Sequence, residues 1–175
     1  MYIRYLKFSL LGVVLGLILA ALNQVNAAES QKTPPPRDIP GITVDDMFPL
    51  GCVSCHLNFI DRNMDTRIST SLANWTETVE PKLLEKAQAA SPDGVILVGK
   101  HPSAADSLTD IPKACIDCHS SMSQNAPVFS QMVHLIHLTG GKDNHYMTIF
   151  QGECTHCHKL NHSSGKWFTP SGNEK

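Results

Sequence analysis

Three copies of the pattern Cys-x-x-Cys-His lie along this chain of 175 residues, and they begin at Cys52, Cys115 and Cys154. Together they use all six cysteines, so no thiol is left over for a disulfide bond. The spacing is that of covalent haem attachment, in which the two thiols form thioethers with the haem vinyl groups. The histidine that follows then binds the iron. The three patterns therefore predict three haems of the c type.

The residues expected to hold these haems fall into two sets. The thioether-forming residues are Cys52, Cys55, Cys115, Cys118, Cys154 and Cys157. The proximal iron ligands are His56, His119 and His158. No catalytic residue is expected, because an iron with two protein ligands is closed to substrates.

The second axial position of each iron needs a distal ligand. The chain has nine histidines, so six remain beyond the motifs, and we expect bis-histidine ligation rather than methionine ligation. His134 and His137 are the strongest candidates, since they stand three apart on an expected helix and so share one face. His101 is the third candidate, because it precedes a proline at a bend after an apolar run.

The remaining histidines are held in reserve. His145 and His162 could serve as ligands or lie on the surface. His156 stands between the two cysteines of the third motif, where attachment constrains it, and we expect it to face solvent or a haem propionate.

Paired cysteines also build zinc sites and thiol redox centres. Zinc ribbons use such pairs two at a time, which three pairs each followed by histidine fit poorly. The segment from Cys154 to Cys157 resembles a disulfide-exchange motif, but the βαβ context of a thioredoxin-like domain is missing. The haem interpretation is therefore favoured.

The first 27 residues have the order of a secretory signal peptide. Arg4 and Lys7 precede an apolar run over residues 8–22, and Val25-Asn26-Ala27 offers a small-residue cleavage site. The run is shorter than the roughly 20 residues that a spanning helix needs, so no stable membrane span is expected after cleavage. The alternative is an uncleaved N-terminal anchor. Export predicts a location in a bacterial periplasm or outside the cell.

Residues 28–41 include Pro34-Pro35-Pro36 and are expected to form an extended linker, and residues 42–175 a single trihaem domain. The formal net charge is −2 and becomes more negative when Arg4 and Lys7 are removed. Nucleic acid is not an expected partner, because its binding needs a basic face.

Helix signals are few and short. Apolar residues over 72–84 recur at helical spacing and are split by Pro81, residues 128–138 form another helical pattern, and Pro112 is expected to open a short helix. A helical turn is expected over residues 43–50, and the part after His158 is expected to be irregular.

The fold class is therefore mainly α with extensive irregular structure: a few short helices wrapped around three haems, with little or no β-sheet. So small an apolar core predicts a largely unfolded apoprotein.

With its three motifs and the element His134-Leu135-Ile136-His137 ahead of the third, the chain resembles a multihaem c-type cytochrome, specifically a small trihaem member. It is similar to the small class III cytochromes and to the multihaem cytochromes of metal-reducing bacteria. In those proteins, such histidines are distal ligands of different haems, and the resemblance implies this role for His134 and His137.

These observations predict an electron-transfer protein rather than an enzyme. Its expected partners are redox proteins, either other cytochromes or a quinol-linked membrane complex. Two alternatives stay open. One is the haem subunit of a respiratory oxidoreductase, with one open iron site that reduces a nitrogen or sulfur oxyanion. The other is a building block of a multihaem electron conduit.

Overall fold

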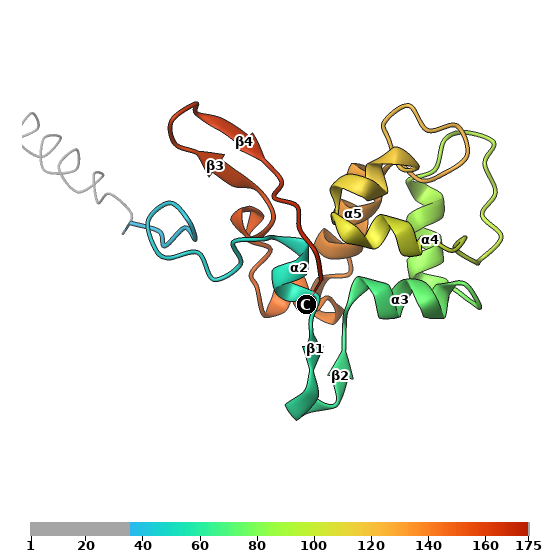
Figure 1. The fold of residues 1–175 in the computed structure, drawn as a ribbon, viewed down its shortest axis with the longest axis horizontal. Helices are drawn as coiled ribbons and strands as arrows, with labels where there is room; N and C mark the ends of the chain where they lie inside the picture. The colour runs from blue at the N-terminus through green and yellow to red at the C-terminus, as the bar shows by residue number, and fades with distance from the viewer. Residues whose placement is uncertain (1–35, 175) are drawn as a thin grey trace, which may run out of the picture. The chain divides into compact units, whose positions relative to one another are not determined.

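The structure is a computed structural model, and it describes residues 36–174 of the chain (Figure 1). The expected signal peptide and the first residues of the expected linker lie outside the described residues. The contacts divide the chain into two units, residues 1–37 and residues 38–175. Everything below concerns the second unit.

Short helices dominate the described residues. The α-helices are α2 (Cys52–Cys55), α3 (Ile68–Trp75), α4 (Pro81–Ala89), α5 (Phe129–Leu138) and α6 (His145–Thr148). Single turns of 3-10 helix join them: η1 (Ile60–Arg62), η2 (Ala105–Thr109), η3 (Lys113–Asp117), η4 (Gly141–Asp143) and η5 (Cys154–His156). The expectation of a mainly α fold with little sheet is confirmed. Within residues 36–174, no helix combines the length and the apolar character needed to cross a bilayer.

The break between α3 and α4 comes from Pro81, as the sequence predicts. Pro81 is the first residue of α4, where its missing N–H costs nothing. The carboxylate of Glu80 caps this helix by accepting a hydrogen bond from the backbone N–H of Leu83 at 3.1 Å. The two segments are therefore separate helices.

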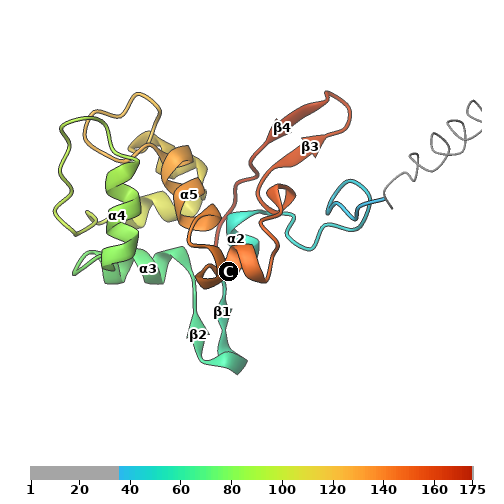
Figure 2. The ribbon, with the colours of Figure 1, turned by 180° about the vertical axis from the view of Figure 1, so that it is seen from behind.

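Helices α4 and α5 pack side by side, as both views show (Figures 1 and 2). The last carbonyls of α5 would be unsatisfied without outside donors. Lys86 of α4 donates from Nζ to the carbonyl oxygens of Ile136 at 3.2 Å and Thr139 at 3.3 Å. This packing fixes the end of α5, which carries His134 and His137.

Two small antiparallel hairpins complete the described fold. Strands β1 (Asn58–Phe59) and β2 (Met64–Asp65) form one, and β3 (Lys159–Asn161) and β4 (Lys166–Phe168) form the other. The second corrects our expectation of an irregular segment after His158. The strands of this hairpin are too short to show an alternation of apolar and polar residues in the sequence. Asn161 closes the loop, because its Oδ1 accepts hydrogen bonds from the backbone N–H groups of Ser163 and Ser164 at 3.1 Å each.

The helical turn expected over residues 43–50 does not form. Thr43 Oγ1 instead accepts a hydrogen bond from the backbone N–H of Ile39, four residues earlier, at 2.7 Å. Thr43 therefore closes a turn that precedes it and does not cap a helix that follows it.

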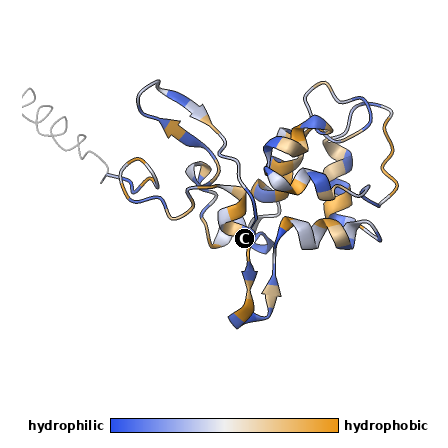
Figure 3. Cartoon of the chain, in the orientation of Figure 1, coloured by the Kyte–Doolittle hydropathy of each residue, from blue (hydrophilic) through white to orange (hydrophobic). Residues whose placement is uncertain are grey.

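The polypeptide builds almost no core of its own. Among the described residues, the buried aliphatic side chains are Val53, Ala90 and Ile111, and the rings of Pro112, Pro127 and Pro170 are buried as well. Five large apolar residues are more than three-quarters exposed: Met47, Ile60, Ile96, Val98 and Met122. Apolar residues follow helices and loops alike and do not collect in one layer (Figure 3). A domain of this size normally buries far more apolar surface.

Candidate functional site

All three Cys-x-x-Cys-His motifs adopt the same local backbone. In each, the N–H of the histidine donates to the carbonyl of the first cysteine: His56 to Cys52 at 2.9 Å, His119 to Cys115 at 3.0 Å, and His158 to Cys154 at 2.9 Å. The motifs lie on α2, η3 and η5 in turn. One helical turn thus returns each histidine to the side of the chain on which its first cysteine lies.

Each motif histidine faces one of the three expected distal histidines. The ring centroids are 6.2 Å apart for His56 and His137, 5.9 Å for His119 and His101, and 6.0 Å for His158 and His134. The structure therefore pairs every proximal candidate with a different distal candidate. The sequence named both sets but not the pairing.

The spacing of these pairs suits one metal ion between two imidazole rings. A metal bound at about 2 Å by one nitrogen of each ring, with each nitrogen about 1 Å from its ring centre, separates the two centroids by about 6 Å. All three measured distances lie within a few tenths of an ångström of this value. The histidines thus fit the axial ligand sets of three irons.

Hydrogen bonds leave the correct nitrogen free in four of these rings. Nδ1 lies within hydrogen-bond distance of a backbone carbonyl: Thr66 for His56 at 2.7 Å, Pro102 for His101 at 2.6 Å, Pro127 for His119 at 2.8 Å, and Val133 for His137 at 2.9 Å. Because a carbonyl can only accept, Nδ1 must carry the proton. Nε2 then keeps its lone pair for a metal.

Burial also favours the neutral, ligating form of the imidazole. It lowers the pKa of His119, His137 and His158 below the usual histidine value, since a charged ring loses its hydration there. The facing ring adds to the effect: His101 lowers the pKa of His119, His56 that of His137, and His134 that of His158. A metal competes only with a proton for these nitrogens, so a lowered pKa assists ligation.

Four of the six motif cysteines, Cys52, Cys55, Cys115 and Cys157, are partly buried, whereas Cys118 and Cys154 are exposed. Burial raises the pKa of Cys52 to about 12 and that of Cys55 to about 11, and it also raises the pKa of Cys115 and Cys157. Cys52 is raised further by the nearby thiols of Cys157 and Cys115. Thiols from all three motifs therefore come close together.

Of the two positions expected for His156, solvent or a haem propionate, the structure does not support the first, because the ring is partly buried. Its ring centroid lies 4.8 Å from that of Phe48, 6.0 Å from Phe150 and 6.3 Å from Tyr146. Its Nδ1 is buried and has no hydrogen-bond partner among the described residues. Burial lowers its pKa, so the ring is neutral and acts as one member of an aromatic cluster. The reserve histidines His145 and His162 are both exposed.

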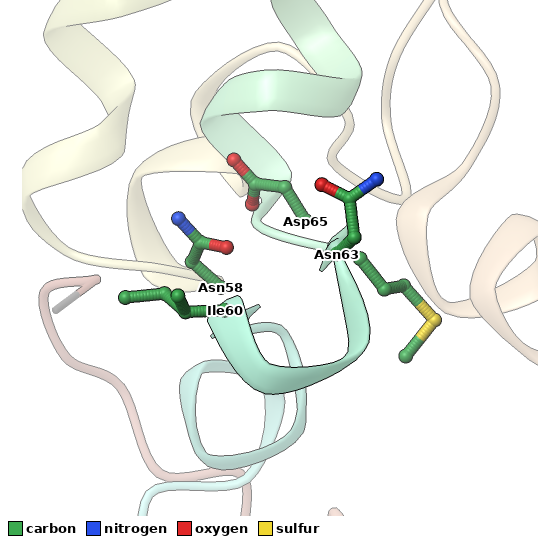
Figure 4. Close-up of a pocket in the computed structure, with 5 residues that line it drawn as sticks. Asn58, Ile60, Asn63 and Asp65 are labelled. Carbon is green, nitrogen blue, oxygen red and sulfur yellow. The ribbon is translucent and has the colours of Figure 1, made fainter.

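A shallow hollow lies on the β1–β2 hairpin, apart from the histidine pairs. It is lined by Asn58, Ile60, Asn63, Met64 and Asp65 (Figure 4). None of these residues is a cysteine or a histidine, so the hollow offers no thiol for haem attachment and no imidazole, and its one sulfur ligand for an iron is the thioether of Met64.

Comparison with known proteins adds no relative. No protein-family model, no curated protein and no solved structure matches this chain. Within residues 36–174, no three His, Cys, Asp or Glu side chains converge on a point where they could hold a bare metal ion. The candidate ligand histidines instead form three separate pairs.

Proposed function

We propose that this protein is an electron carrier with three c-type haems, each held by two cysteines and ligated by two histidines. The observation that carries the proposal is the pairing of every motif histidine with a separate second histidine at about 6 Å. The first site uses His56 and His137, the second His119 and His101, and the third His158 and His134.

The residues that would hold each haem also suit its chemistry. When bound, a haem iron takes up and returns one electron by changing between the ferric and ferrous states. Two histidines fill both axial positions, so no position is left for a substrate. In four of the six rings, the carbonyl that accepts from Nδ1 fixes the ring and makes it a stronger donor to the metal. This is the arrangement expected of a carrier.

The scarcity of core residues supports the same proposal. Three aliphatic side chains and three prolines are buried in the described part of the chain, while Ile96 and Val98 are each 85% exposed. Three large, mostly apolar macrocycles would supply the missing interior. Thioethers from six cysteines would anchor them as disulfides do in other small exported domains.

We further propose that the protein works outside the cytoplasm and exchanges electrons with other redox proteins, either cytochromes or a quinol-linked membrane complex. The expected export signal and the expected haem attachment support this location. An acidic chain favours partners with a basic docking surface.

The deciding experiment is an EPR spectrum of the purified ferric protein, with haem quantified on the same sample. We expect three low-spin haems per chain and no high-spin signal. A stoichiometric high-spin signal that shifts with cyanide, nitrite or sulfite would contradict the carrier and indicate an open iron, as in an oxyanion reductase.

A further inference from the structure

One segment of the chain, residues 169–174, touches the first and third motifs and the residues that lead into the second, and we call it the strap. At its start, Thr169 Oγ1 lies 3.5 Å from Nδ1 of His158 in the third motif. The buried Pro170 then packs on Gly51, directly before the first motif: a Cβ added to Gly51 would lie 3.2 Å from Pro170 Cγ. The strap therefore joins the third motif to the first.

The middle of the strap binds the segment that leads into the second motif. Gly172 and Ile111 exchange backbone hydrogen bonds, with N···O distances of 2.8 Å and 2.9 Å. Ser171 Oγ donates to Asp110 Oδ1 at 2.5 Å and accepts from the backbone N–H of Lys113 at 3.3 Å. Ile111 is 1% exposed, so this connection is well shielded from water.

The same residues of the strap lie against the first motif. A Cβ on Gly172 would lie 3.5 Å from Cγ2 of Val53, a first-motif residue that is 3% exposed. A Cβ on Gly51 would lie 3.7 Å from the carbonyl oxygen of Cys157, in the third motif. The residue before the first motif thus lies against the third motif, and Gly172 lies between Val53 of the first motif and Ile111, which precedes the second.

Two further observations place the first motif between the others. Its distal partner His137 and the third site's partner His134 are three residues apart on α5, about 5 Å along the helix axis. The thiol of Cys52 is close enough to Cys157 and to Cys115 for both to raise its pKa.

We propose that the strap clamps the first haem site between the other two, which makes the first haem the middle member of the array. This inference rests on the proposed function. It adds an order, second–first–third, that neither the motif sequence nor the numbering of the cysteines contains.

The order has a measurable consequence. Oxidation of one haem adds a positive charge, which opposes oxidation of its neighbours, and this interaction weakens as the separation grows. The interactions of the first haem with the second and with the third must then each exceed the interaction between the second and the third.

The test is a redox titration of the intact holoprotein followed by NMR, with the haem methyl signals read at each stage of oxidation. A fit to these signals gives, for each pair of haems, the shift in the potential of one haem when the other is oxidised. The second–third shift is expected to be the smallest. If it is equal to or larger than either of the others, the proposed order is wrong.

Gly172 offers a matched pair of variants for the role of the strap. Gly172→Ala adds a Cβ at ordinary contact distance and is expected to leave all three interactions unchanged. Gly172→Leu places three more carbons against Val53 and Leu50, which pushes the strap away, and is expected to lose most of the first–second interaction. An equal first–second interaction in the two variants would overturn the role of the strap.

Ser171→Ala provides the same test if Gly172→Leu does not mature. It removes the bonds to Asp110 and Lys113, so the first–second interaction should fall while the first–third interaction stays. A fall in both, or in neither, would contradict the proposal. A sample without three low-spin haems refutes the proposed function itself, whereas three low-spin haems in another order refute only this inference.

Discussion

His134 and His137 lie on adjacent turns of α5, yet their rings face histidines of different motifs, His158 and His56. One short helix therefore contributes a histidine to two of the histidine pairs, and any shift of α5 moves both. Its far end is fixed by Lys86 from α4 and by Asn144 from the loop that follows.

The two histidines of α5 should be separable by substitution. His134→Met and His137→Met are each expected to change one haem from bis-histidine to histidine–methionine ligation and to raise its potential. The haem affected should be the third in His134→Met and the first in His137→Met. Optical spectra and potentiometric titration measure this. The exposed His145→Met is the control and should leave all three haems unchanged. Both α5 variants retaining three bis-histidine irons would refute the assignment.

The angles between the paired rings predict two kinds of EPR signal. Parallel axial rings split the iron π orbitals and give a rhombic signal, whereas perpendicular rings leave these orbitals nearly equal in energy and give a strongly anisotropic one. The rings of His101 and His119 are 14° from parallel, and those of His56 and His137 are at 85°.

The rhombic signal should therefore disappear in His101→Met and the strongly anisotropic one in His137→Met. His162→Asn, in the exposed β3–β4 loop, is the matched control and should preserve both. Loss of the anisotropic signal in His101→Met would show that the pairs are oriented differently from the structure.

Asn144 is expected to hold His137 in place through the end of α5. Its Nδ2 donates to the carbonyls of Ile136, His137 and Thr139 at 2.7–2.9 Å, and its Oδ1 accepts from the N–H of Tyr146 at 2.9 Å. Asn144→Ala loses both roles and should lower the unfolding free energy of the holoprotein by about 1–3 kcal/mol.

Asn144→Asp separates the two roles, because it keeps the acceptor for Tyr146 and loses the donor to α5. If the donor matters, Asn144→Asp destabilises nearly as much as Asn144→Ala, and in both the potential of the first haem shifts. Chemical denaturation and redox titration measure these effects. If Asn144→Asp is as stable as the wild type, Asn144 stabilises the protein only through its hydrogen bond to Tyr146 in α6.

A nearly buried ion pair ties the chain before the first motif to the end of the third. Lys159 Nζ lies 2.8 Å from Asp46 Oδ2, and the side chains are 10% and 18% exposed. Lys159 also donates to the carbonyl of Thr155 at 2.6 Å. Asp46→Asn keeps the acceptor for Phe48 N–H but leaves the lysine charge uncompensated, so we expect a loss of about 3 kcal/mol.

The double variant Asp46→Asn, Lys159→Met removes the unpaired charge and should recover part of that loss. Denaturant unfolding of the wild type, both single variants and the double variant gives the coupling between the two side chains. Simple addition of the single effects would show that the pair contributes no interaction.

Asp65 makes stability depend on acid pH. Hydrogen bonds from Arg67, with Nη2 2.6 Å from Oδ2, hold the pKa of this carboxyl well below its usual range. Because the folded pKa is lowered, its contribution is complete above the unfolded value of about 4 and is lost as pH falls through the folded value.

The variant Asp65→Asn should therefore melt below the wild type at neutral pH, and the difference should shrink as the solution is acidified below about pH 4. Thermal unfolding across this range measures it, with Asp61→Asn on the same hairpin as the control. A difference in melting temperature that grows in acid would show that folding raises the pKa of Asp65 and does not lower it.

The sequence could name the candidate ligands because motif spacing is a local property. Pro81 divided two helices and the residues around His134 formed a third, as local signals indicated. The pairing of the histidines could not be predicted in this way. It depends on contacts between distant parts of the chain, such as that between Gly172 and Ile111, which are 61 positions apart and which no sequence pattern marks. Nothing in the sequence marks Thr66 as the acceptor for His56, because any residue has a carbonyl.

The strap also bears on the order of events during maturation. It follows all three motifs along the chain, so every cysteine is synthesised before the segment that gathers the motifs exists. If the proposed haems are attached before the strap closes, the attaching enzyme meets each motif on an open chain, where both thiols are accessible. Once residues 169–174 pack onto Val53 and Ile111, four of the six thiols are partly buried, that of Cys52 among them. A chain that closes before it is fully loaded would be a dead end, and timely delivery of haem would then limit the yield of active protein.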